Sequence, residues 1–179
     1  GGSTAYPEGP GLNIPVNMSV AFHSDAGCHP TDKLVGTFMF YTIKDDDKET
    51  TYPSGGDRIC NRDFADFIQT QIVEDIRQTM MPTWQKRHLM HQSMSETRNP
   101  KVPSTIIELL SHHNYYDMTF GLDPKFKFIA SRAIYKGMLR FIHQTTGTPY
   151  VVQPLPVQQM NISYANNDSL HITWAERVD

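Results

Sequence analysis

Two short apolar stretches, each ending in a polar side chain, place the strongest constraint on how this 179-residue chain folds. Val20–Phe22 runs directly into His23, and Thr105–Ile107 runs directly into Glu108. Short apolar runs bounded by turn residues are typical of buried strands in a parallel or mixed sheet. Reactive side chains in open α/β sheets lie where such strands end. We therefore expect the two stretches to meet, with His23 able to bind a metal and Glu108 able to move a proton.

Composition narrows the class of protein. The length suits one domain with its own core and part of a second, and 39% of the residues are hydrophobic. No apolar run reaches about 18 residues, so we expect no transmembrane segment. The net charge of −3 comes without a basic stripe, which argues against a nucleic-acid partner. Cys28 and Cys60 are too few for a disulfide framework and are expected to be free thiols or one optional bridge.

Hydrophobic patterning predicts the strands of an α/β fold. Strands are expected at residues 16–22, 34–43 and 102–110, where apolar runs are bounded by loop residues. Residues 88–91 fit either a helix or a strand. The charged segment at residues 44–57 is expected to form a solvated surface loop.

Two helices have boundary signals in the sequence. The first is expected from Asp63, a suitable N-cap, to about Met81, because an apolar stripe runs along it. The second is expected to begin at Asp123 as N-cap, with Pro124 in its first turn, and to end near Gly147. Helices and strands together predict an α/β fold with a mixed β-sheet flanked by helices.

The character of the chain changes after Tyr150. Residues 151–156 form a proline-containing linker, and alternating strands are expected at residues 160–164 and 170–174 around a polar turn. Two strands do not bury a core alone. We therefore expect one domain over residues 1–150 and the start of an all-β domain over residues 151–179.

Two motifs resemble those of the zinc-dependent N-acetylmuramoyl-L-alanine amidases, which remove stem peptides from bacterial cell-wall glycan. The family's third metal ligand lies in a Ser-x-His-x-Asn-Ala motif, and residues 21–26 (Ala-Phe-His-Ser-Asp-Ala) are similar to it. Its catalytic glutamate lies in Pro-Ala-x-Leu-x-Glu-x-Gly-Phe-x-Ser-Asn, which residues 103–114 resemble with Glu108 in the glutamate's place. Arg98 matches an arginine ten positions before that glutamate. The resemblance covers roughly residues 10–145.

The resemblance implies a set of site residues around one zinc ion. His23 would be a zinc ligand, and Glu108 would act as general base and acid with help from Arg98. The residues that would contact substrate are Ser24, Asp25, His112 and His113. The implied substrate is peptidoglycan or a muropeptide, which places the protein outside the cytoplasm of a bacterium.

The family's first two metal ligands, a histidine and a glutamate, lie upstream of the third. The 22 residues before His23 contain no histidine, and Glu8 is their sole acidic residue. We therefore expect the N-terminal part of the amidase domain, with the other ligands, to lie upstream of this chain, and the chain alone to be inactive. His29, His88 and His91 are weaker candidates as substitutes, since their spacing matches no metal motif.

Residues 151–179 resemble the opening strands of a fibronectin type III module, with Trp174 as its core tryptophan. A non-catalytic cell-surface or carbohydrate-binding protein that keeps the amidase shell remains open. So does a polysaccharide-active enzyme of the kind labelled xanthan lyase.

Individual residues also have other interpretations. His23 fits a hydrogen-bonded structural histidine, and Glu108 fits a glutamate in a salt bridge with Arg98. Glu96 and Arg98 fit either a structural ion pair or a site for a substrate carboxylate, because arginine offers a bidentate fork.

Overall fold

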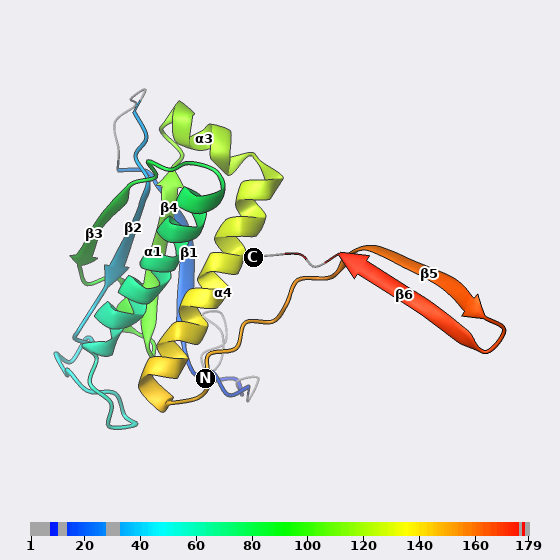
Figure 1. The fold of residues 1–179 in the computed structure, drawn as a ribbon. Helices are drawn as coiled ribbons and strands as arrows, with labels where there is room; N and C mark the ends of the chain where they lie inside the picture. Colours follow the sequence, from blue (N-terminus) through cyan, green and yellow to red (C-terminus); the bar gives the residue numbers. More distant parts are fainter. Residues whose placement is uncertain (1–7, 11–13, 28–32, 176, 178–179) are drawn as a thin grey trace. The chain divides into compact units, whose positions relative to one another are not determined.

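A computed structural model describes residues 8–10, 14–27, 33–175 and 177 of the chain (Figure 1). Two compact units divide the chain, Gly1–Thr148 and Pro149–Asp179. Among the described residues, none of the helices has the length and apolar character needed to cross a membrane.

The first unit is built on a four-stranded sheet with the strand order β1-β4-β2-β3. Its strands are β1 (Ser19–Asp25), β2 (Thr37–Tyr41), β3 (Lys86–His91) and β4 (Ser104–Ser111). β4 lies parallel to β1 and antiparallel to β2, whereas β2 and β3 are parallel. This confirms the mixed sheet that the sequence predicts, and it resolves residues 88–91 as extended because they pair with β2.

The pairing register brings the two key stretches side by side. His23 of β1 is the register partner of Glu108 of β4, and Glu108 in turn lies opposite Phe38 of β2. Successive side chains of a strand point to opposite faces of a sheet. His23, Glu108 and Phe38 therefore form a row across three strands on one face.

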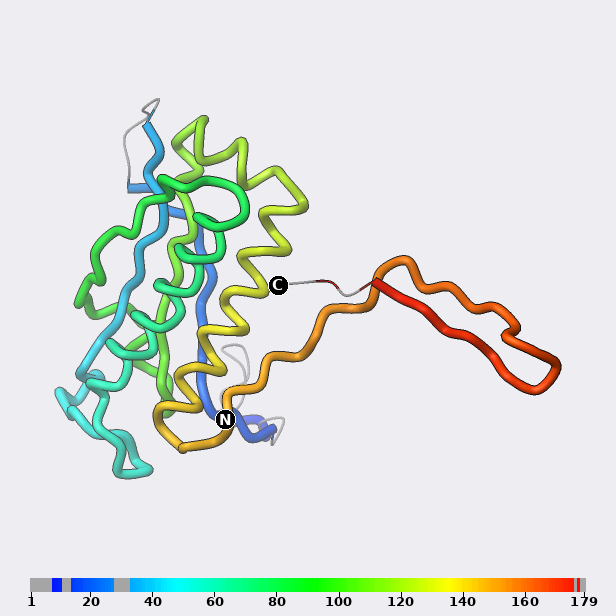
Figure 2. The backbone as a smooth tube through the Cα atoms, viewed as in Figure 1, coloured from blue at the N-terminus to red at the C-terminus, as the bar shows by residue number. Residues whose placement is uncertain are grey.

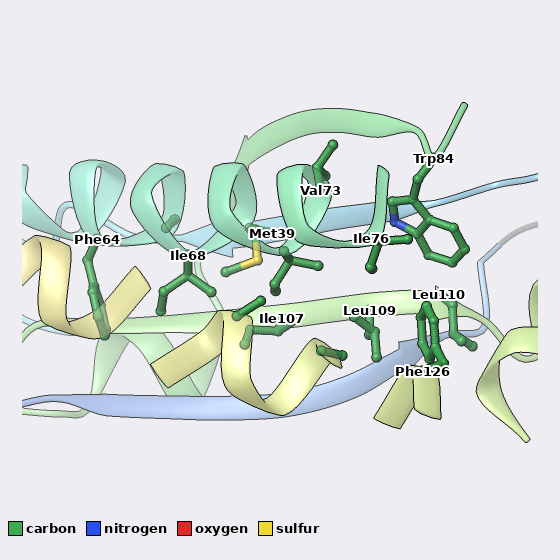
Figure 3. Close-up of a cluster of buried hydrophobic side chains, with 14 of the residues drawn as sticks. Met39, Phe64, Ile68, Val73, Ile76, Trp84, Ile107, Leu109, Leu110 and Phe126 are labelled. Carbon is green, nitrogen blue, oxygen red and sulfur yellow. The ribbon is translucent and has the colours of Figure 1, made fainter. Parts of the chain in front are cut away.

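Two long helices, α1 (Cys60–Thr79) and α4 (Pro124–Thr146), pack together on the other face (Figure 1). Figure 3 shows their apolar side chains meeting those of the sheet in one core. The buried residues include Met39, Phe64, Ile68, Ile72, Ile107, Leu109 and Phe126. Gly137 permits the close helix crossing, because a Cβ at this position would lie 2.7 Å from the Cα of Ile68.

Local signals place the ends of α4 correctly and the start of α1 incorrectly. The Asp123 carboxylate accepts a backbone N–H of the first turn at 2.8 Å, and Gly147 ends α4 with a φ of 70°. The predicted N-cap at Asp63 is wrong, because α1 begins at Cys60. The chain turns earlier because the Asp57 carboxylate accepts a backbone N–H just before the helix, at 2.9 Å.

Two short helices flank β4, namely α2 (Ser95–Arg98) before it and α3 (Tyr115–Gly121) after it. The buried carboxylate of Asp117 in α3 accepts the backbone N–H of Ser111 at 2.9 Å and that of Val35 at 2.9 Å. These two bonds tie the end of β4 to the segment that enters β2, so they fix the edge of the sheet at which the key side chains lie.

The second unit is a hairpin of β5 (Gln158–Asn166) and β6 (Ser169–Ala175), seen as a paired tube in Figure 2. In its turn, the Asn166 side chain accepts the backbone N–H of Asp168 at 3.0 Å. Alternate positions carry apolar side chains that are each at least 44% exposed, namely Met160, Ile162, Tyr164, Leu170, Ile172 and Trp174. The fibronectin type III assignment stays a prediction.

Candidate functional site

The candidate site lies at the edge where β1 and β4 end and where the antiparallel β2 begins. His23 and Glu108 occupy neighbouring positions there, and Phe38 continues the row. Because α1 and α4 pack on the opposite face, these side chains point away from the helical core. Parallel strand ends of this kind commonly carry reactive groups in α/β sheets.

His23 contacts a carboxylate from a distant part of the chain. Its Nε2 lies 2.9 Å from Oε1 of Glu96, a residue of α2. The two side chains are 41% and 44% exposed. The sequence allows Glu96 either in a structural ion pair or in a site for a substrate carboxylate, and in the structure its carboxylate contacts the predicted metal ligand.

Glu108 has a buried oxygen with no hydrogen-bond partner among the described residues, namely Oε2. Burial raises the pKa of the Glu108 carboxyl above its ordinary value, and the nearby carboxylates of Asp25 and Glu96 raise it further. His23 and Arg87 act in the opposite direction and lower this pKa. A carboxylate with an unpartnered buried oxygen and a raised pKa, held within a β-strand, is well suited to accept a proton.

A β-bulge brings to the site an arginine that the sequence analysis does not single out. The register of β2 and β3 shifts opposite Phe38, at the position of Arg87. The Arg87 guanidinium carbon lies 4.1 Å from the centre of the Phe38 ring, and Nη1 lies 2.7 Å from Oδ2 of Asp25. Buried Gln69 of α1 holds the bulge by donating to the carbonyls of Arg87 at 2.8 Å and Thr37 at 3.0 Å.

Asp25 is engaged by the protein itself. Its Oδ2 accepts from Arg87, its Oδ1 accepts the backbone N–H of Gly27 at 2.7 Å, and the residue is 6% exposed. The structure therefore places Asp25 as the anchor of Arg87 at the end of β1. Its predicted contact with substrate stays a prediction.

Ser24 and His112 meet at the end of β1, where they line a pocket of about 430 Å³ together with His23 and with Phe126 and Ala130 of α4. The Ser24 hydroxyl lies 2.9 Å from Nδ1 of His112, and the rings of His112 and His113 pack edge to face with centroids 4.5 Å apart. All three side chains are exposed where β1 and β4 end. They remain candidates for contact with a substrate.

Arg98 lies elsewhere in the structure. Its Nε forms an ion pair with Asp46 at 2.5 Å, and its Nη1 donates to the Ser93 hydroxyl at 3.0 Å. Within the described part of the chain, the salt bridge between Arg98 and Glu108 that the sequence allows is not formed. The predicted catalytic role of Arg98 stays a prediction.

An open groove of about 470 Å³ lies beside β1 and α2, and its lining includes Glu96, the partner of His23. It is lined by Ser19, Ala21, Ser95, Glu96, Asn99 and Pro100. Ser19 and Ala21 precede His23 at alternate positions of β1, so the groove leads along the strand to the candidate site. A concave surface with a few convergent polar groups is typical of a ligand site.

Within the described ranges, no three histidine, cysteine, aspartate or glutamate side chains form a group that could hold a metal ion. His88 stacks on Phe38 and His91 stacks on Tyr41, so both rings pack along the sheet. Cys60 is a half-buried free thiol. Cys28 and His29 lie outside the described residues.

Comparison with known proteins gives a fold but no family assignment. No protein-family model and no curated protein matches this sequence. Solved structures do match, and those named as amidases include the following three. The N-acetylmuramoyl-L-alanine amidase AmiC2 of Nostoc punctiforme matches 71% of this chain with a TM-score of 0.51 and 16% identity.

Two further structures give similar values. The N-acetylmuramyl-L-alanine amidase Ami1 from Mycobacterium smegmatis matches 72% of the chain with a TM-score of 0.53 and 18% identity. The CwlD amidase from Clostridioides difficile, in complex with the GerS lipoprotein, matches 74% with a TM-score of 0.52 and 18% identity. This chain spans 58%, 55% and 57% of the three structures, respectively. The first unit therefore has the α/β fold of these amidases over part of their length.

Proposed function

We propose that this chain forms part of a zinc-dependent hydrolase that cleaves the amide between N-acetylmuramic acid and L-alanine in peptidoglycan. One observation carries the proposal: His23 and Glu108, the two residues that resemble the family's ligand and base, are register partners in the C-terminal halves of two adjacent parallel strands. The amidase fold of the first unit supports it. An amide of the cell wall as substrate implies a location outside the cytoplasm of a bacterium.

The residues present fit a zinc site in their chemistry. Neutral imidazole is a preferred zinc ligand, and the His23 side chain is half-exposed, with its Nε2 lying 2.9 Å from Oε1 of Glu96. The unpartnered Oε2 of Glu108 lies on the neighbouring strand, where a base would be needed. When bound, zinc supplies a Lewis acid that polarises a carbonyl and lowers the pKa of a bound water. The resemblance implies further ligands upstream of this chain.

Glu108 performs the proton transfers in the proposed reaction. Its Oε2 takes a proton from the attacking water and then gives that proton to the nitrogen of the leaving amine. Burial raises the pKa of this carboxyl, which makes its ionised form a stronger base than an exposed glutamate. The Glu108 carboxyl is kept in place by β4, whose end is fixed by the hydrogen bond that the Asp117 carboxylate accepts from the backbone N–H of Ser111.

The other site residues orient the reaction. Arg87 is held by Asp25 and lies over Phe38, so its remaining N–H donors are close to the row that contains Glu108. Ser24 and His112 are exposed at the strand ends and can donate or accept hydrogen bonds to the peptide portion of a substrate.

The test is release of free peptide from purified muropeptides by a form of the protein extended upstream to include the implied ligands. We expect Glu108→Gln to slow release by at least about 100-fold, the scale of general base catalysis. Glu74→Gln is the matched control, because Glu74 lies on α1 and pairs with Arg140 at 3.7 Å. Unchanged release by Glu108→Gln would contradict the proposal. Binding of muropeptide without release would favour the non-catalytic alternative.

A further inference from the structure

We propose that Arg87 binds the acyl oxygen on the N-acetylmuramic acid side of the amide that is cleaved. This inference rests on the proposed function and names the group of the substrate that this part of the site recognises. In the substrate, the oxygen belongs to the amide carbonyl. In the product, it shares a carboxylate with the oxygen that the attacking water supplies, while the nitrogen leaves with the peptide. A planar guanidinium suits both forms, because two of its N–H groups can donate to one oxygen or to both oxygens of a carboxylate.

The guanidinium of Arg87 has one occupied edge and one open edge. Its Nη1 donates to Oδ2 of Asp25 at 2.7 Å, while Oδ1 of Asp25 accepts the backbone N–H of Gly27 at 2.7 Å. Asp25 therefore holds Arg87 through a single hydrogen bond. Nε and Nη2 share the other edge, and neither has a hydrogen-bond partner among the described residues. The side chain is 24% exposed and neither nitrogen is a buried atom without a partner, so a ligand can reach this edge.

The fold fixes Arg87 from three sides. The side chain of Gln69, which is fully buried, donates to the carbonyl of Arg87 at 2.8 Å and to that of Thr37 at 3.0 Å, across the β-bulge between β2 and β3. The guanidinium carbon lies 4.1 Å from the centre of the Phe38 ring, and Asp25 holds Nη1. Bulges beside active sites commonly re-aim a side chain. A binding residue needs this support, because its donors must be in place before the ligand arrives.

The open edge lies beside the proposed general base. Phe38 is the register partner of Glu108, so the guanidinium over Phe38 lies next to Glu108 in the row, on the side away from His23. Glu108 activates the water in the proposed reaction, so the carbonyl carbon that this water attacks lies near its carboxyl. The oxygen on that carbon gains negative charge as the water adds, and a fixed N–H donor stabilises that charge. Arg87 is therefore placed to hold the oxygen while Glu108 transfers the proton.

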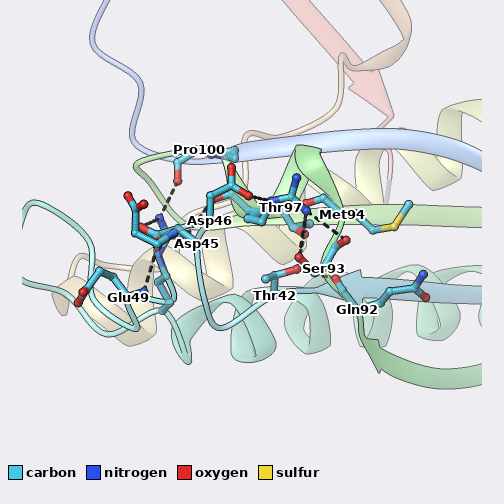
Figure 4. Close-up of polar contacts among 12 residues, drawn as sticks. Thr42, Asp45, Asp46, Glu49, Gln92, Ser93, Met94, Thr97 and Pro100 are labelled. Carbon is cyan, nitrogen blue, oxygen red and sulfur yellow. Dashed lines mark hydrogen bonds and ion pairs between the residues drawn. The ribbon is translucent and has the colours of Figure 1, made fainter.

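The arginine that the sequence resemblance singles out, Arg98, is engaged elsewhere. It belongs to a polar network around Thr97 (Figure 4). The buried Thr97 hydroxyl lies 2.6 Å from that of Thr42, and Nε of Arg98 pairs with Asp46. Asp46 thus takes the edge of Arg98 that corresponds to the open edge of Arg87.

The experiment follows the Nε–H signal of Arg87 by NMR in the isotope-labelled 179-residue chain. The signal is identified by the contact of the guanidinium with the Phe38 ring. Two sugars are added in turn: N-acetylmuramic acid, which carries the carboxylate that cleavage leaves, and N-acetylglucosamine, which lacks it. We expect a saturable shift of the Arg87 signal with N-acetylmuramic acid and no shift with N-acetylglucosamine. An arginine that only pairs with Asp25 would give no such response.

The variant Arg87→Lys tests the open edge. Lysine keeps a positive charge beside Asp25 but cannot donate two parallel hydrogen bonds from a planar edge. We expect it to raise the Kd of N-acetylmuramic acid by about tenfold or more, the scale of a lost hydrogen bond to a charged group. Arg62→Lys is the matched control, because the Arg62 side chain lies on α1 and is 55% exposed, and it should leave this Kd unchanged.

Each outcome decides the inference. An Arg87 signal that does not move with N-acetylmuramic acid, or that moves equally with both sugars, would overturn it. So would an Arg87→Lys variant that binds N-acetylmuramic acid as tightly as the wild type does. If that variant does not fold, the wild-type titration decides, because it needs no substitution.

The peptide-release assay separates this inference from the proposed function. Release that depends on Glu108, without a shift at Arg87, would overturn the inference alone. A shift at Arg87 that is specific to N-acetylmuramic acid, without release of peptide by the extended protein, would overturn the hydrolase alone.

Discussion

Glu108 combines a buried, unpartnered oxygen with neighbouring charges of both signs. Burial raises the pKa of its carboxyl, Asp25 and Glu96 add to that effect, and His23 and Arg87 oppose it. Burying an ionised group without a hydrogen-bond donor costs folding free energy. A general base needs this same condition, because a less well solvated carboxylate binds a proton more strongly. At this residue, stability and the proposed function therefore have opposing requirements.

A pH titration of stability tests this opposition. The folded protein binds a proton on Glu108 more tightly than the unfolded chain does, since the pKa is raised in the folded state. Its free energy of unfolding therefore falls as pH rises from about 4.3, the usual glutamate pKa, through the raised pKa. In chelator-treated protein, we expect Glu108→Gln to have a higher Tm than the wild type above this window.

The higher Tm of Glu108→Gln should disappear at pH values below the usual glutamate pKa, because the wild-type carboxyl is then protonated in both the folded and the unfolded state. Differential scanning calorimetry between about pH 4 and pH 8 measures the Tm difference between Glu108→Gln and the wild type. Glu74→Gln, on the exposed surface of α1, should show no such pH-dependent gain. A Tm difference for Glu108→Gln that stays constant with pH would contradict this account.

At the scale of elements, the site depends on how strands and helices meet. The bulge in β3 turns Arg87 toward Phe38, and Gln69 of α1 holds that bulge from the helical side. The position of α1 in turn depends on its crossing with α4 at Gly137. Helix packing on one face therefore supports the placement of polar groups on the other.

The helix crossing gives a prediction about Gly137. Alanine favours a helix over glycine by about 1 kcal/mol, but its Cβ here would lie 2.7 Å from the Cα of Ile68 and must displace backbone. Overpacking of this kind costs about 1–3 kcal/mol. We expect Gly137→Ala to lower the urea midpoint, corresponding to a loss of about 1 kcal/mol or more. Ser131→Ala, on the exposed side of α4, should not lower it. A urea midpoint for Gly137→Ala equal to or above that of the wild type would show that α1 and α4 can move apart to make room for the Cβ without loss of stability.

At the scale of the whole molecule, the two units differ in how far their apolar side chains are exposed. The first unit buries them between its helices and its sheet. The hairpin of the second unit instead exposes the apolar residues of β5 and β6, with Ile162 opposite Ile172 and Tyr164 opposite Leu170. An exposed apolar surface of this kind marks an interaction site or promotes association.

A dye-binding experiment tests the hairpin surface. We expect the dye ANS to fluoresce less when it is mixed with the double variant Ile162→Thr and Ile172→Thr than when it is mixed with the wild-type chain. The double substitution should also reduce self-association in light scattering, because threonine keeps β-propensity but removes apolar area. Ser163→Thr is the control on the opposite face of the hairpin. Equal ANS fluorescence for all three proteins would show that this surface is not accessible to the dye.

Much of the first unit follows from local sequence rules. The α/β class and the strands that carry His23 and Glu108 follow from apolar runs that end in polar residues. The ends of α4 follow from Asp123 and Gly147, since capping depends on residues adjacent in the chain. The start of α1 was predicted wrongly because Asp57 provides the turn several residues earlier.

Other features depend on contacts between distant residues, and no local pattern predicts them. Glu96 meets His23 only because the network around Thr97 fixes α2, and Arg98 turns toward Asp46 rather than Glu108. Periodicity, capping and motif spacing thus specified the class of fold and which strands end in reactive residues, since these properties reside in neighbouring residues. The folded chain specified which carboxylates and guanidinium groups surround those residues, because bulges, register and side-chain pairing arise only when separate segments pack together.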